Sequence, residues 1–101
     1  MKIAISSIDK DENSEVSYIT GKAPYFLIFE NGKLVKTLPN PFKIGGGGAG
    51  FGVAEMLSEE KVKMVVSGEF GGNIIGALES KGIKYKEISG ITVKEVLEKV
   101  L

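Results

Sequence analysis

The sequence predicts an α/β domain in which three helices cover a mixed five-stranded sheet. In the second half of the chain, short apolar runs typical of strands alternate with segments of helical period, as in a parallel sheet crossed by helices. In the first half an Asn-Gly pair joins two apolar runs, which is typical of an antiparallel hairpin. The length of 101 residues fits one domain, 1–101, with a single core.

Three strands are expected first. Lys2 to Ser6 is a short apolar run, typical of a buried central strand. Two further runs, Tyr25 to Glu30 and Lys33 to Leu38, are separated only by Asn31-Gly32, a pair that readily supplies the two positive-φ positions of a type I′ turn. Pro39 ends the second run because it has no N–H to donate to a sheet.

Helices and strands then alternate. A glycine cluster leads into a helix from about Gly50 to Glu60, and the β-branched run Val62 to Ser67 predicts a buried parallel strand. The second helix is expected to have Asn73 as its N-cap and Gly82 as its C-terminal stop. The stretch Ile83 to Ile88 alternates apolar residues with lysines, which is typical of an edge strand protected against edge-to-edge pairing.

The last helix has the strongest sequence signals. Thr92 and Glu95 have the spacing of a capping box, and Glu95 precedes Lys99 by one turn. The apolar stripe expected to face the core consists of Val93, Val96, Leu97, Val100 and Leu101.

The topology predicts where a ligand would bind. With right-handed crossovers, the hairpin lies on one side of the first strand and the Val62 strand on the other, so the chain leaves these two neighbours in opposite directions. Open α/β sheets bind ligands at such a divergence, beyond the carboxyl ends of the strands. Here that position falls at Ser6 and Ser7 after the first strand, and at Ser67 and Gly68 after the Val62 strand.

Composition excludes several classes of function. The chain has no Cys and no His, so disulfides, thiolate metal sites, a thiol nucleophile and the usual proton shuttle are all missing. Its 13 basic residues are all lysines and balance 13 acidic ones, so we expect no nucleic-acid or membrane partner.

No apolar run approaches the ~18 to 20 residues of a membrane helix, and the start lacks signal-peptide features, so we expect a cytoplasmic protein. The lack of Cys, Gln and Arg beside abundant Lys and Glu favours a thermophilic source.

The glycine cluster allows two interpretations. Gly45 to Gly50 formally matches the dinucleotide fingerprint G-x-G-x-x-G, but a run of four glycines satisfies such spacings trivially. Free N–H groups at the start of a helix also favour anions, so the cluster is either a phosphate or anion cradle or a plain loop. The first interpretation would make the protein a nucleotide- or anion-binding regulatory module.

Other motifs do not predict a site. Asp9-x-Asp11-x-Asn13 resembles the opening of a calcium loop, but Ser14 replaces the required Gly and Thr20 the bidentate Glu. The serines have no His to activate them as nucleophiles. We therefore predict no catalytic residues and no enzyme activity.

Several segments together resemble the dinitrogenase iron-molybdenum cofactor biosynthesis family. They are MKIAIS, V-S-Y-I-T-G-K-A-P-Y-F-L-I-F-E, the Asn-Gly hairpin, the glycine cluster, V-V-S-G-E-F-G-G-N, L-x-x-x-G-I-K and T-V-K-E-V-L, which cover nearly the whole chain in order. The resemblance implies a three-layer ribonuclease-H-like fold. It also implies a small binding or accessory domain for an iron-molybdenum or iron-sulfur cofactor.

The resemblance also implies a site made of the loop Ser17 to Lys22, the glycine cluster and the stretch Gly68 to Asn73. Together with the topology it predicts a cofactor-binding set of Ser6, Ser7, Ser17, Ile19, Lys22, Gly46, Gly47, Gly48, Gly50, Ser67, Gly68, Gly71 and Asn73.

Three positions depart from the family pattern. Ile19 and Thr20 stand where the family usually has His-Phe, with the His a candidate cluster ligand, and Gly72 stands where the family often has Pro. Because Ile cannot bind iron, we predict no metal-ligating residue and a ligand that is either a metal cofactor or another small anion. The expected oligomeric state is a monomer or a weak homodimer, and an interaction domain that dimerises through the hairpin edge is a third hypothesis.

Overall fold

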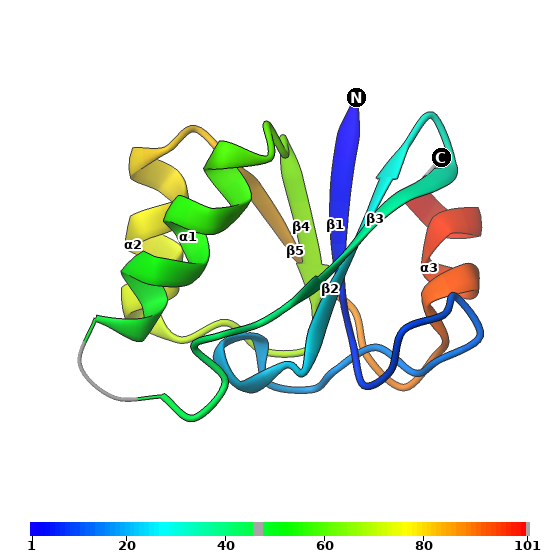
Figure 1. Ribbon diagram of the computed structural model, residues 1–101, viewed down its shortest axis with the longest axis horizontal. Coiled ribbons are helices and arrows are strands. Elements are labelled where there is room, and N and C mark those ends of the chain that lie inside the picture. The colour runs from blue at the N-terminus through cyan, green and yellow to red at the C-terminus, as the bar shows by residue number, and fades with distance from the viewer. Residues whose placement is uncertain (46–47, 101) are drawn as a thin grey trace.

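The computed structural model describes residues 1–45 and 48–100 of the chain (Figure 1). The elements are β1 (Lys2–Ser7), the 3-10 helix η1 (Thr20–Lys22), β2 (Tyr25–Glu30), β3 (Lys33–Pro39), α1 (Ala49–Glu59), β4 (Met64–Ser67), α2 (Gly72–Ser80), β5 (Lys84–Glu87) and α3 (Val93–Val100). None of the helices in these ranges has the length and apolar character that a membrane crossing requires.

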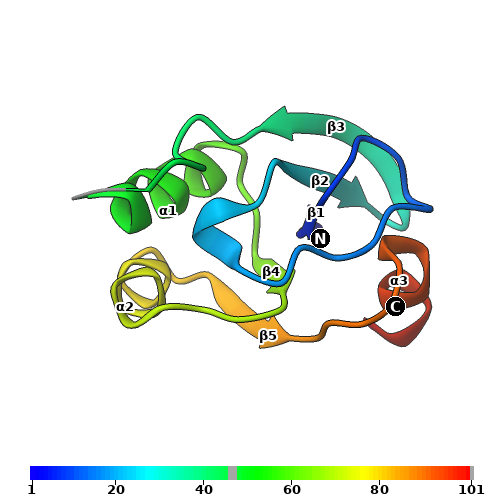
Figure 2. The ribbon, with the colours of Figure 1, turned by 90° about the horizontal axis from the view of Figure 1, so that it is seen from below.

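The sheet has the predicted composition and order. Its five strands run β3-β2-β1-β4-β5, with β1 antiparallel to β2 and parallel to β4. The hairpin therefore lies on one side of β1 and β4 on the other. Figure 2 shows α1 and α2 on one face of the sheet and α3 on the opposite face, which makes three layers.

Each face of the sheet has its own apolar core. Along the central strands, alternate residues point to opposite faces: Ala4 and Val65 face α1 and α2, while Ile5 and Val66 face α3. Phe26 and Ile28 of β2 contribute to the first core, and Leu27 and Phe29 to the second. Because these strands are buried on both sides, their sequences are continuous apolar runs rather than alternating ones.

Local signals correctly placed the hairpin turn, the end of α2 and the N-terminal cap of α3. Asn31 and Gly32 have φ of 52° and 81°, as the type I′ prediction requires, and Gly82 ends α2 with φ of 71°. Thr92 and Glu95 form the reciprocal capping box: the Thr92 N–H donates to Glu95 Oε1 over 3.0 Å, and the Glu95 N–H donates to Thr92 Oγ1 over 3.2 Å.

Several predicted boundaries were wrong, and the largest shifts occur where a helix turns into a strand. β4 begins at Met64, because the buried Val62 still donates its N–H to the Leu57 carbonyl at the end of α1. β5 is likewise shorter than predicted, since the Ile83 N–H closes α2 by donating to Leu78 O. Both apolar residues fill the core without belonging to a strand.

The remaining corrections are small or concern caps. β1 and β3 each extend one residue further, to Ser7 and Pro39. The N-cap of α2 is Gly71, which makes no side-chain capping bond, so Asn73 is not the cap but an exposed residue of the first turn. Leu101 lies outside the described residues.

The capping box predicts a specific acid sensitivity. The hydrogen bonds from the Thr92 N–H and hydroxyl, with a smaller effect of Lys99, hold the pKa of Glu95 below its ordinary value of 4.5. A carboxylate with a lowered pKa in the folded state stabilises the fold above the unfolded pKa, and this contribution is lost as the pH falls through the folded pKa. We expect Glu95→Gln to lower the free energy of unfolding at pH 7 and to make it fall less between pH 5 and pH 3.

Urea unfolding at the two pH values, followed by circular dichroism, measures this effect. Glu98→Gln on the same helix is the control, since this exposed carboxylate makes no hydrogen bond among the described residues. Thr92→Ala removes the other half of the box and should cost about 1 kcal/mol at neutral pH. Equal pH dependence of Glu95→Gln and the unmodified protein would contradict the prediction.

Candidate functional site

The serines at the ends of β1 and β4 meet, as the topology predicted, but they are covered. Ser6 Oγ and Ser67 Oγ lie 2.6 Å apart, and both lie within 3.3 Å of the Ser17 carbonyl oxygen. Each hydroxyl has one proton, so one hydroxyl donates to the other and the second donates to Ser17 O. Ser6 and Ser67 are fully buried and Ser17 is nearly so. The Ser6 and Ser67 side chains therefore bind the loop that contains Ser17 to the ends of β1 and β4. Contact between these serines and a ligand stays a prediction.

Ser7 shapes the exit from β1. Its buried hydroxyl donates to the Asp9 carbonyl over 2.6 Å and accepts the Asp9 N–H over 3.3 Å. Both bonds are local, so they define the turn that starts the following loop.

Backbone hydrogen bonds fasten the loop before η1 onto the connection between β4 and α2. The Gly68 N–H donates to Ser17 O over 3.0 Å, and the Glu69 N–H donates to Tyr18 O. In return, the Thr20 N–H and hydroxyl both donate to Glu69 O, over 3.0 and 2.6 Å. This short parallel pairing extends β4 past its last residue and fixes where Ile19 lies.

Gly68 allows this close approach. A Cβ at this position would overlap the Tyr18 carbonyl oxygen and lie 2.6 Å from Tyr18 Cα. Both are backbone atoms, which cannot rotate away as a side chain could. The predicted importance of Gly68 therefore has a structural reason, which is the contact between two loops.

A second set of hydrogen bonds, made by the Asn40 side chain, holds η1 and was not predicted from the sequence. Asn40 is 3% exposed, and its Nδ2 donates to the carbonyls of Gly21 and Ala23 over 3.1 and 3.0 Å. Its Oδ1 accepts the Phe42 N–H over 2.9 Å. Asn40 thus ties η1 to the segment that enters the glycine cluster. The available signal was an Asn between two prolines, which indicates a turn but not a distant partner.

The N-termini of α1 and α2 converge beside η1. A Cβ on Gly50 would lie 2.9 Å from Ile74 Cγ1, and one on Gly21 would lie 3.3 Å from Ile74 Cδ1, so both elements pack against the same side chain. Figure 1 shows that both helices begin at the end of the molecule where η1 lies. Gly48, with φ of 84°, caps α1, and Gly71 caps α2. Gly46 and Gly47 lie outside the described residues.

Several predicted residues at this end reach solvent, together with apolar ones that were not predicted. Lys22, Gly71 and Asn73 are exposed, and Ile19 is 43% exposed. Tyr18, which lies in the predicted loop Ser17 to Lys22, is 61% exposed, and Ile44 and Phe51, which were not predicted, are 91% and 62% exposed. We call this end of the molecule the loop end; its described residues are the loop 17–22, the segment 43–45, the start of α1 at 48–51 and the stretch 68–73.

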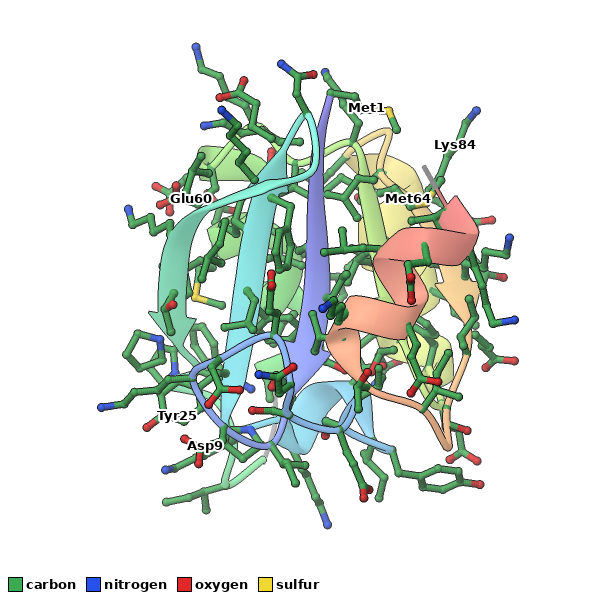
Figure 3. The ribbon with its side chains drawn as sticks, turned by 90° about the vertical axis from the view of Figure 1, so that its right-hand side faces the viewer. Met1, Asp9, Tyr25, Glu60, Met64 and Lys84 are labelled. Atoms are coloured by element: carbon green, nitrogen blue, oxygen red, sulfur yellow. The ribbon has the colours of Figure 1, made fainter. Side chains whose placement is uncertain are left out.

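The donor chemistry of the loop end does not fit side-chain ligation of iron. The sequence has neither thiolate nor imidazole, and no group of three acidic residues among those described could hold a metal ion. Figure 3 shows Met1 and Met64 toward the end opposite Asp9 and Tyr25, and Met56 packs against the core. What the loop end does offer an anion is two helix N-termini and the exposed ammonium groups of Lys22 and Lys43.

Comparison with known proteins gives a consistent result. A family model described as dinitrogenase iron-molybdenum cofactor matches residues 1–101. The apo form of the orange protein from Desulfovibrio gigas has the same fold, with a TM-score of 0.90 and 22% identity over 97% of this chain and 84% of that one. A putative NifB protein from Thermotoga is similar with a TM-score of 0.84 and 28% identity, over 96% of this chain and 84% of that one. The curated proteins contain no match to the sequence.

The contact at Gly68 predicts a large effect of one added methyl group. Gly68→Ala should force the Tyr18 loop away from β4 and lower the free energy of unfolding by about 2 to 4 kcal/mol, the range of severe core and backbone defects. Gly76→Ala is the matched control, because a Cβ there meets no atom within 4 Å and Gly76 lies inside α2. It should stabilise the protein by about 0.5 to 1 kcal/mol. Chemical denaturation of both variants measures the difference, and equal stabilities would refute the role given to Gly68.

Proposed function

Because the chain belongs to the dinitrogenase iron-molybdenum cofactor family, we propose that it is a small cofactor-binding or carrier domain without catalytic activity of its own. The proposed ligand is a preassembled, anionic metal–sulfur cluster, and the proposed site is the loop end. One observation carries this proposal. The N-termini of α1 and α2 lie at the loop end together with the loop before η1, which is hydrogen-bonded to the β4–α2 connection.

The mode of binding is proposed from the side chains present. With no Cys or His in the chain, the cluster would be held as an intact anion by backbone N–H groups and by Lys22 and Lys43. Exposed apolar groups, Ile19 and Tyr18 among them, would cover part of its surface and exclude water. Such a cargo keeps its own iron coordination, so it can leave without breaking a bond to the protein.

Anaerobic titration with isolated iron–molybdenum cofactor tests this proposal. After gel filtration, we expect iron and molybdenum to elute with the protein, with an electron paramagnetic resonance spectrum like that of the free cofactor. Ile19→His places an imidazole at a half-exposed position of the fastened loop, where the family usually has His. That variant should retain the cofactor more tightly and change its spectrum.

Charge reversal supplies the second arm of the experiment. Lys22→Glu combined with Lys43→Glu should reduce the retained metal about tenfold, because two attractive charges become repulsive. Lys84→Glu combined with Lys86→Glu changes the net charge equally on β5 and should leave retention unchanged. Absence of metal from the unmodified protein, or equal loss in both double variants, would overturn the proposal.

The alternative function, a nucleotide- or anion-binding module, would use the same helix N-termini. The two hypotheses differ in the ligand that the protein binds. A thermal-shift series with ATP, inorganic phosphate and sulfate is the comparison. A rise in melting temperature with a phosphate ligand, together with no retention of the cofactor, would favour the regulatory module.

A further inference from the structure

β5 has an open edge. It is the last strand of the sheet, and in the described part of the chain no strand lies beyond it. The N–H groups of Lys84 and Ile88 donate to Lys63 O and Ser67 O, toward β4. Alternate residues of a parallel strand bond to opposite sides, so the N–H and C=O groups of Tyr85 and Glu87 point outward. Neither amide has another backbone partner among the described residues.

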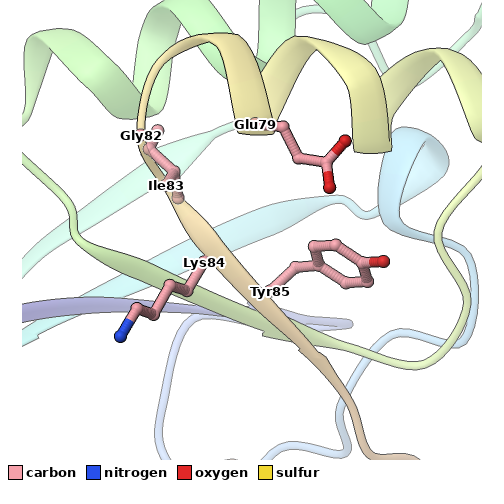
Figure 4. A pocket seen from close by; sticks show the side chains of 5 residues that line it. All are labelled: Glu79, Gly82, Ile83, Lys84 and Tyr85. Atoms are coloured by element: carbon pink, nitrogen blue, oxygen red, sulfur yellow. The ribbon is translucent and has the colours of Figure 1, made fainter.

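A groove of about 470 Å³ runs beside this edge, between the end of α2 and β5 (Figure 4). It is lined by Glu79, Gly82, Ile83, Lys84 and Tyr85, and its walls are mostly apolar. The Tyr85 ring packs on Phe70 with 5.0 Å between the centroids, and Glu87 Oε2 accepts the Phe70 N–H over 3.2 Å. Of the residues that line the groove, Tyr85 is therefore held in place by its contact with Phe70.

Charges decide which kind of strand can pair with β5. Lys84 and Lys86 lie on the face of β5 opposite Tyr85, because successive side chains alternate. An antiparallel pair of two β5 strands centred on Tyr85 would place Lys84 of one copy opposite Lys86 of the other, which is repulsive. The same lysines attract a strand that carries carboxylates at these positions.

We propose that β5 is a docking edge for an extended segment of a partner protein in which acidic and apolar residues alternate. The segment would add a sixth strand, bonding to the outward backbone groups of Tyr85 and Glu87. Its acidic side chains would face Lys84 and Lys86, and an apolar side chain would enter the groove beside Tyr85. This surface lies on the sheet edge rather than at the loop end, and the proposal does not rest on the proposed cofactor site.

Nuclear magnetic resonance titration of the uniformly ¹⁵N-labelled protein tests the proposal with two synthetic peptides. The acidic probe is acetyl-Glu-Val-Glu-Leu-Glu-amide, and the basic comparison has Lys in place of each Glu. We expect the acidic peptide to shift the amide signals of Tyr85 and Glu87 and to slow their hydrogen exchange. Shifts at other residues, or no binding at millimolar peptide, would overturn the proposal.

Two variants sharpen the test. Lys84→Glu combined with Lys86→Glu should weaken acidic-peptide binding about tenfold and favour the basic peptide. Lys33→Glu combined with Lys94→Glu is the matched control, since both lysines are exposed on other elements, and binding should be unchanged. Equal effects of the two pairs, or a dimer of the unmodified protein in sedimentation that Lys84→Glu and Lys86→Glu abolish, would contradict the proposal.

Discussion

The Ser17 carbonyl oxygen is the acceptor on which the loop end depends. It accepts the Gly68 N–H and one proton from the Ser6–Ser67 hydroxyl pair, so residues distant in the sequence meet at one atom. The three serines are buried and Gly68 is half-buried, and a buried polar group left without a partner is costly. These hydrogen bonds therefore depend on one another: if the loop moved away, Ser17 O, the Gly68 N–H and one serine hydroxyl would lose their partners together.

Two consequences follow for the surface above it. The fastened loop presents Tyr18 and Ile19 to solvent although apolar side chains usually pack inside. The same loop, through Asn40 and Ile74, fixes the starts of α1 and α2 relative to each other. For the proposed function, a surface that is both apolar and bordered by helix N-termini would suit a large anionic ligand better than a bare metal ion, which needs oxygen or nitrogen donors from the protein.

The sequence predicted the features whose causes are local or periodic. The Asn31-Gly32 turn, the Thr92–Glu95 capping box and the order of the five strands follow from residue type and spacing, and they are confirmed. The topology also brought Ser6 and Ser67 together. Their burial could not be foreseen, because it depends on where a loop without periodicity folds back. Asn40 was missed for the same reason: its partners are 17 and 19 residues away.

The lack of Cys and His matters most at position 19, in the loop before η1. A His at position 19 would sit on a loop fixed to the β4–α2 connection by three backbone hydrogen bonds and by the Thr20 hydroxyl, which is a suitable position for a metal ligand. Ile19 occupies it here with nearly half of its surface exposed. At this position the chain therefore offers a ligand an apolar contact and no coordinating group. For the proposed function this means that shape, apolar contact and charge would hold the intact cargo, and that its release would require no coordination bond to the protein to be broken.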